Sequence, residues 1–234
     1  MAKLTKDDCY RDLKNRILST DLAPGSDLDE ATLTDRYGLS RTPLREIFQR
    51  LAGGGYVRLE TNRGAKVASM DIGTMRTFFQ TAPMVYANIA RLAAENRTTK
   101  QLDVLKEAQR QFGRATDHGD TSASALANHR FHAMIGAMAH NPYLSACLDR
   151  LLIDHTRLSH QFYRPKSSGD NARIAKASEQ HDAMISAIEG HEAALAIDLT
   201  LQHWDLSKDR MEDFVRPDPL PIDVVSLEDR KNAV

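Results

Sequence analysis

The segment "GLSRTPLREIFQRLAGGGYV", residues 38–57, restricts the fold more than any other part of the chain. Ser40 is suited to cap a helix that follows it. Apolar residues recur through that helix at helical spacing, at Leu44, Ile47, Phe48 and Leu51. Three consecutive glycines then end it. The next residues, "YVRLETNRGAKVAS", alternate on both sides of a Thr-Asn-Arg-Gly turn, which predicts a β-hairpin.

Two further helices are predicted before this segment, near 5–19 and 29–37. Three helices and a terminal hairpin within residues 1–70 are typical of a winged helix-turn-helix domain. Between residues 36 and 66 the chain carries seven Lys or Arg against two Asp or Glu. Such a local excess of positive charge attracts a polyanion, although a solvated basic face remains the alternative.

From residue 71 onward the strand signals stop and helical periodicity continues to about residue 214. Six helices are predicted, near 71–96, 99–117, 122–140, 142–163, 171–189 and 191–214. The sequence therefore predicts a mostly α protein, in which an all-α antiparallel six-helix bundle spans residues 71–215. The tail, residues 216–234, is rich in proline and then charged, so we expect it to be extended or mobile.

Composition excludes several classes of protein. No run of 18 apolar residues occurs, so we expect no membrane span. The charged N-terminus lacks the apolar core of a signal peptide. Cys9 and Cys147 lie far apart in the sequence, which argues against a disulfide framework and favours the cytoplasm.

The helix that follows Ser40 has the chemistry of a recognition helix. In a helix-turn-helix, the first turn of the second helix reaches base edges and phosphates in the major groove. Arg41 and Arg45 share one face, and an arginine can bind guanine O6 and N7 through two hydrogen bonds. Ser40 and Thr42 offer hydroxyls to phosphate oxygens. Arg63 and Gly64 lie at the tip of the predicted wing. The alternative is a surface helix with solvated arginines.

All nine histidines lie after residue 117. His132, His181 and His203 fall on the apolar faces of three different predicted helices, and Asn128 precedes His132 by one turn. Neutral imidazoles suit Zn²⁺ and Ni²⁺, and facing helices of a bundle can surround one divalent ion. The alternative is that these histidines are hydrogen-bonded core residues with a structural role.

The segment "LDEATLTDRYGLSRTPLREIFQRLAGGGYVRLETNRGAKV" resembles the DNA-binding domain of the GntR family of bacterial transcription regulators. The resemblance implies that DNA is contacted by Ser40, Arg41, Thr42, Arg45, Arg63 and Gly64. It also implies a homodimer on the double-stranded DNA of a pseudo-palindromic operator. Ala31 departs from the family, since some members place a further DNA-contacting residue there, and this leaves the operator sequence open.

The segments "NHRFHAMIGAMAHNPYL", "EQHDAMISAIEG" and "LTLQHW" are similar to the FCD ligand-binding domain of GntR regulators. The resemblance implies a divalent cation held by Asn128, His132, His181 and His203, and a small carboxylate effector. Asn128 stands where many members have Asp, which removes one negative charge. Ala82 and Tyr86 occupy the places of an arginine and a glutamate that many members use. Arg157 is an alternative effector contact, and a surface role for Arg157 is the other interpretation.

These features together predict a ligand-responsive repressor that binds DNA. A helical phosphohydrolase of the HD type, fused to a DNA-binding domain, is the alternative, because His181 and Asp182 form an HD dipeptide. Adjacent helical residues diverge by about 100°. Asp182 therefore falls outside the apolar face that contains His181, and no paired general acid and base accompanies it.

Overall fold

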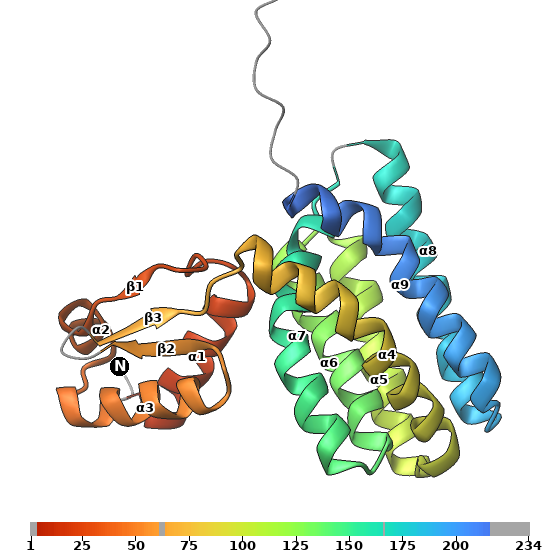
Figure 1. Ribbon diagram of the computed structural model, residues 1–234, viewed down its shortest axis with the longest axis horizontal. Coiled ribbons are helices and arrows are strands. Elements are labelled where there is room, and N and C mark those ends of the chain that lie inside the picture. Colours follow the sequence, from red (N-terminus) through yellow and green to blue (C-terminus); the bar gives the residue numbers. More distant parts are fainter. Residues whose placement is uncertain (1–3, 61–63, 166, 216–234) are drawn as a thin grey trace, which may run out of the picture.

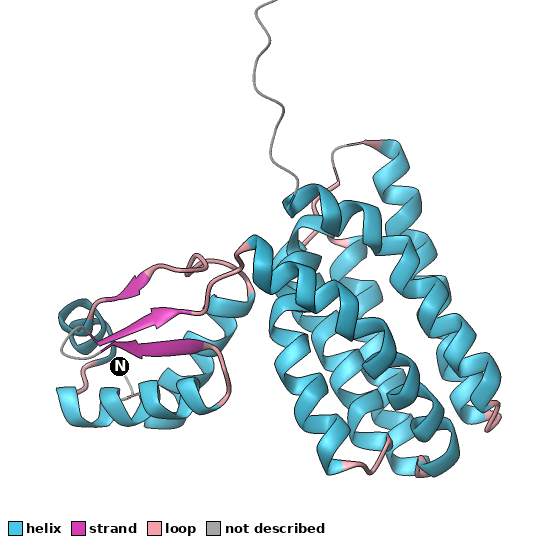
Figure 2. Cartoon of the chain, viewed as in Figure 1, coloured by secondary structure: helices cyan, strands magenta, loops and turns pink. Residues whose placement is uncertain are grey.

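The computed structural model describes the backbone of residues 4–60, 64–165 and 167–215, and the side chains of these residues up to 206. Figure 1 shows two units, a small one that contains helices and a sheet and a larger one of long helices. Figure 2 shows that all the strands belong to the small unit. The mostly α fold predicted from the sequence is confirmed.

The small unit contains three helices, α1 (Lys6–Leu18), α2 (Glu30–Tyr37) and α3 (Arg41–Gly53). Each begins at a polar residue, and the side chains of Thr5 and Asp29 accept backbone hydrogen bonds there. Ser40 occupies the cap position of α3 with extended backbone, but its hydroxyl makes no capping bond. The apolar face predicted for α3 is fully buried.

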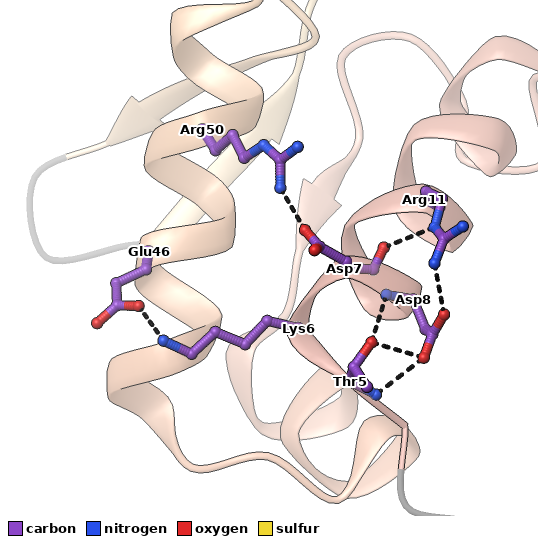
Figure 3. A network of polar contacts seen from close by, with 7 residues as sticks. All are labelled: Thr5, Lys6, Asp7, Asp8, Arg11, Glu46 and Arg50. Carbon is purple, nitrogen blue, oxygen red and sulfur yellow. Dashed lines mark hydrogen bonds and ion pairs between the residues drawn. The ribbon is translucent and has the colours of Figure 1, made fainter.

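Two ion pairs join α1 to α3 along their exposed sides, as Figure 3 shows. Lys6 pairs with Glu46, and Arg50 pairs with Asp7 at 2.6 Å. All four side chains are exposed, so each pair adds little to stability. The buried apolar side chains between the two helices therefore hold them together.

The hairpin consists of β2 (Val57–Glu60) and β3 (Gly64–Val67), paired antiparallel. A third strand, β1 (Asp27–Leu28), pairs with the other edge of β3, giving the order β1-β3-β2. The sequence analysis did not predict β1, because two residues are too few to show alternation. Gly64 has a φ of +83°, a conformation that glycine adopts without strain.

Residues 68–71 lead from β3 into the helical unit. Its six helices are α4 (Ile72–Asn96), α5 (Thr99–Asp117), α6 (Thr121–Met138), α7 (Pro142–Phe162), α8 (Ser168–Glu189) and α9 (Ala193–Val215). They agree with the predicted helices to within a few residues. The start of α8 is the largest difference, because Ser167 and Asp170 form a capping box that begins the helix earlier.

Helix α7 connects the two units. Its Ile153 is fully buried within the apolar core of the small unit, and α1 packs against α7. One turn further, Arg157 pairs with Asp154 and donates a hydrogen bond of 2.6 Å from Nη1 to the carbonyl oxygen of Ala68. The interpretation of Arg157 as a surface residue is wrong. Its guanidinium is buried because a carboxylate and a carbonyl are available inside the protein.

Among the described residues, no helix is both long enough and apolar enough to cross a membrane. The two cysteines are unpaired, with Cys9 buried in the small unit and Cys147 exposed on α7.

Candidate functional site

The first turn of α3 is presented to solvent. Ser40, Arg41, Thr42 and Arg45 are all exposed, whereas the opposite face of the helix is buried against α1 and the sheet. Short hydroxyls and arginines are thus placed together at the open end of one helix. This is the arrangement that a major-groove contact requires.

Glu30, at the start of α2, holds Arg45 in place. Its carboxylate accepts hydrogen bonds from Arg45 Nε at 3.0 Å and from Nη2 at 3.2 Å, and this raises the pKa of Arg45. A Cβ at Gly64 would lie 3.4 Å from Cγ of Glu30, so the turn end of the hairpin also approaches this side chain. Arg63 lies outside the described residues. Glu30 was not identified from the sequence, because acidic residues are not expected at a DNA interface.

Three histidines meet inside the helical unit, from α6, α8 and α9. One ring nitrogen of each of His132, His181 and His203 lies within 4.8 Å of the others, and all three side chains are buried. Asn128 is buried one turn before His132 on α6. We call these four residues the histidine chamber. The structure therefore brings together the histidines that the sequence placed on the apolar faces of separate helices.

Two buried glutamines set the tautomers of two of these rings. Gln109 accepts a hydrogen bond from Nδ1 of His181 at 2.9 Å, and Gln180 accepts one from Nδ1 of His203 at 3.1 Å. The amide of Gln109 is itself oriented by donating to the backbone oxygen and hydroxyl of Ser178. With Nδ1 protonated, the Nε2 atom of each neutral ring carries a lone pair. Such partners are typical of histidines that bind a metal.

The two Nε2 atoms face each other at 3.3 Å. A hydrogen bond between them would require one ring to be protonated at both nitrogens. Burial opposes this, because it lowers the pKa of His203 to about 4 and the pKa of His181 well below its usual value. Two lone pairs therefore meet in the interior, where a cation would be stabilised between them.

Two further polar atoms of the chamber have no hydrogen-bond partner, Oδ1 of Asn128 and Nε2 of His132. Burial, followed by the neighbouring histidines, lowers the pKa of His132 well below its usual value, so this ring is also neutral. Buried polar atoms without partners are rare in proteins and costly. Their donor type fits a divalent ion such as Zn²⁺ or Ni²⁺, and a ring nitrogen of His132 lies within 4.8 Å of those of His181 and His203.

A fourth histidine lies beside the chamber. His155 on α7 is buried, and its ring centroid is 5.0 Å from that of His132. Its Nδ1 lies 2.6 Å from the hydroxyl of Tyr86 on α4. The sequence analysis did not single out His155. Its helical spacing with Leu148, Leu152 and Leu158 is the only signal in the sequence that it points inward.

Two other residues considered from the sequence are placed away from the chamber. The guanidinium of Arg157 is engaged by Asp154 and Ala68, so we assign it no contact with an effector. Asp182, the second residue of the HD dipeptide, is exposed, as its helical position predicted. It cannot share a metal site with His181.

Comparisons with known proteins match both parts of the chain. The profile of bacterial regulatory proteins of the gntR family matches residues 5–67, and the profile of the FCD domain matches residues 84–206. The FCD match alone covers more than half of the chain.

Individual relatives agree with these matches. The HTH-type transcriptional repressor GlaR of Escherichia coli is 28% identical over 86% of this chain and 92% of its own. The galactonate operon transcriptional repressor of Escherichia coli is 26% identical over 75% and 83%. The solved structure of McbR/YncC of E. coli has a similar fold, with a TM-score of 0.76 at 18% identity over 90% and 98% of the two chains. The family and these relatives are transcription regulators rather than enzymes, which rules against the phosphohydrolase alternative.

Proposed function

Because the chain belongs to the GntR family of bacterial transcription regulators and carries an FCD domain, we propose how it regulates. It is a cytoplasmic homodimeric repressor whose affinity for an operator depends on a small carboxylate. The carboxylate binds at a divalent metal ion in the histidine chamber. Zn²⁺ and Ni²⁺ are the ions that suit its ligands.

One observation carries the metal proposal. Oδ1 of Asn128 and Nε2 of His132 are buried without partners, and the ring of His132 lies beside two imidazoles whose tautomers Gln109 and Gln180 set. One cation would satisfy all four atoms at once. If the histidines had a purely structural role, each nitrogen would instead be expected to have a hydrogen-bond partner.

The chemistry of the four ligands supports an anionic effector. Asn128 and the three neutral histidines carry no formal charge, so a divalent ion would keep both of its charges in a buried site. Buried charge that is not compensated is strongly unfavourable. A carboxylate that coordinates the ion would compensate it. One relative is named for the galactonate operon, and galactonate is itself a carboxylate.

The DNA-binding part of the proposal rests on the exposed first turn of α3. Two copies of α3, related by a two-fold axis, would contact the two halves of a pseudo-palindromic operator. Arg41 and Arg45 contact base edges, Ser40 and Thr42 contact phosphates, and the tip of the wing, at Gly64, lies along the DNA backbone. The effector changes operator affinity only through its different affinity for two arrangements of the domains, typically by ~1–3 kcal/mol.

The operator interaction is tested by selecting bound sequences from a random DNA library with the full-length protein. We expect a pseudo-palindromic sequence to be enriched and bound by a dimer. In fluorescence anisotropy, Arg41→Ala should lower affinity for that sequence about tenfold or more. The matched control is Arg91→Ala, which removes a half-exposed arginine of α4 that is paired with Glu95. Equal affinities of the two variants would contradict the assignment.

The metal and effector are tested on protein purified without an affinity tag. We expect about one divalent ion per chain by mass spectrometry, and its loss in His181→Ala. Adding small carboxylates to the metal-loaded protein should release the operator DNA. If no ion is bound and chelation leaves the unfolding temperature unchanged, the histidines have a structural role instead.

A further inference from the structure

A cavity of about 540 Å³ opens to the surface where α5 and α7 end, beside the start of α6 and along α8. Its volume lies within the range of small-molecule sites in proteins. None of the four residues of the histidine chamber lines this cavity. It is therefore a separate candidate site, and neither the metal nor the carboxylate proposed above occupies it.

The described residues that line the cavity include three acids and no Lys or Arg. Asp117 comes from α5, and Glu179 and Asp182 lie one turn apart on α8. Glu179 pairs with Lys176 at 3.0 Å, whereas Asp117 and Asp182 have no ion-pair partner in the described part of the chain. Asp117 is also the last residue of α5, where the helix dipole disfavours a negative charge. The cavity would therefore attract a cation and repel a carboxylate.

Two hydroxyl groups of the lining can only accept further hydrogen bonds. Thr116 Oγ1 already donates to the backbone oxygen of Gly113 at 2.8 Å, and Ser124 Oγ donates to that of Asp120 at 2.7 Å. A hydroxyl has one hydrogen to donate, so these two groups offer only their lone pairs to a ligand. Together with the carboxylates, they favour a ligand that donates several hydrogen bonds.

Tyr163 adds a buried side chain whose polar atom has no partner. It is 5% exposed, and its ring packs edge-on against Phe112 and Phe162, with centroids 5.3 Å and 5.1 Å away. Tyr163 lines the cavity, and its hydroxyl has no hydrogen-bond partner among the residues that the structure describes. Burial raises the pKa of Tyr163, so the hydroxyl stays neutral. A ligand in the cavity would provide the missing partner of this group.

We propose that this cavity binds a linear organic diamine, with one ammonium group near Asp117 and the other near Glu179 and Asp182. The carboxylates are not grouped for a metal ion, because among the described residues only the three histidines bring three ligand atoms within 4.8 Å of one another. Negative charge on two opposite walls instead suits two ammonium groups joined by a chain. Each ammonium group donates three hydrogen bonds. Ile174 and Ala175 offer apolar contacts to the methylene groups between them.

Isothermal titration calorimetry of the full-length protein tests the proposal with ethylenediamine, putrescine and cadaverine. The tightest of these is then compared with the amino alcohol and the diol of the same chain length. Replacing one ammonium group by a hydroxyl should weaken binding about three- to fivefold, and the diol should not bind detectably. Added salt should weaken the binding of the diamine, because charged groups near the surface are screened.

Variants of the lining locate the binding. Asp117 and Asp182 are exposed, so Asp117→Asn and Asp182→Asn remove a charge without changing the packed core. Each should weaken diamine binding about three- to fivefold. Tyr163→Phe, which removes only the hydroxyl, should weaken it by a similar factor. The matched control is Asp103→Asn, an exposed acid of α5 outside the cavity, and its affinity should stay within about twofold of the wild type.

Three results would overturn the proposal. The first is that none of the diamines binds, and the second is that the diol binds as tightly as the diamine. The third is that Asp103→Asn weakens binding as much as Asp117→Asn and Asp182→Asn, which would show that amines associate with the acidic surface in general. The operator and the metal are absent from this experiment, so its failure would leave the proposed function untouched.

Discussion

Helix α7 borders two buried polar clusters that differ in charge and in the kind of atom that has no hydrogen-bond partner. Toward the DNA-binding domain, Asp154 and Arg157 form an ion pair, and the guanidinium also binds the carbonyl of Ala68. Toward the bundle interior, His155 lies beside the histidine chamber, whose ligand atoms are neutral and include two without partners. The first cluster pairs its two charges within the chain, although Nε of Arg157 has no hydrogen-bond partner. The second leaves neutral oxygen and nitrogen acceptors without partners, and these are the atoms that a bound cation would satisfy.

Removing the charge of Asp154 should reduce stability more than any other change considered below. Asp154→Asn leaves the Arg157 guanidinium buried without its counter-charge, and we expect stability to fall by about 3–5 kcal/mol. Chemical denaturation followed by circular dichroism measures this loss. A loss below about 1 kcal/mol would show that Asp154 does not compensate a costly buried charge.

Binding of zinc to the histidine chamber should stabilise the protein. Free Zn²⁺ at about 100 times its dissociation constant should add about 2.7 kcal/mol to the free energy of unfolding. In His203→Phe, which keeps a ring of similar size, this gain should disappear. Thermal unfolding with and without zinc measures both effects. An equal gain in the two proteins would place the binding of zinc elsewhere.

Removing both charges from the ion pair should cost less than removing one. In the double variant Asp154→Leu with Arg157→Met, no buried charge is left unpaired. The Ala68 carbonyl loses its donor, and the half-exposed Arg150 loses its carboxylate partner. We expect a loss of about 1 kcal/mol relative to the wild type. Comparison with Asp154→Asn gives the coupling between the two residues. If the double variant is no more stable than the single one, the buried charge is not the source of the loss.

Removing a polar atom from the chamber should have the smallest effect. In metal-free protein, Asn128→Leu replaces an oxygen that has no partner with an apolar group of similar size. The free energy of unfolding should stay the same or rise by about 1 kcal/mol, while stabilisation by zinc is lost. A large loss of stability without metal would mean that Asn128 has a structural role.

Periodicity and local motifs in the sequence predicted the helices and the faces that they bury. The recognition helix follows from Ser40, an apolar face and three glycines, and helical spacing correctly placed His132, His181 and His203 on inward faces. Periodicity shows which face of a helix is apolar, but it does not show which helices stand opposite one another. The contact of His155 with Tyr86, 69 residues apart, therefore could not be predicted.

Charge misled the interpretation of Arg157. An arginine on a helix is normally assigned to the surface, because its burial requires a counter-charge and further acceptors. Asp154 is visible in the sequence three residues earlier, but the second acceptor, the carbonyl of Ala68, is 89 residues away. Only the packing of the linker against α7 brings that carbonyl to the guanidinium.

The insertion of Ile153 into the core of the DNA-binding domain has a consequence for how such regulators can be recombined. A chimera that joined residues 1–70 to an unrelated sensory module would leave a void where this side chain belongs, with the usual destabilisation of an underpacked interior. The domain boundary near residue 70 therefore does not separate the two apolar cores, because Ile153 of α7 packs within the DNA-binding domain. A working chimera would therefore need the turn of α7 that contains Ile153 as well as the DNA-binding domain.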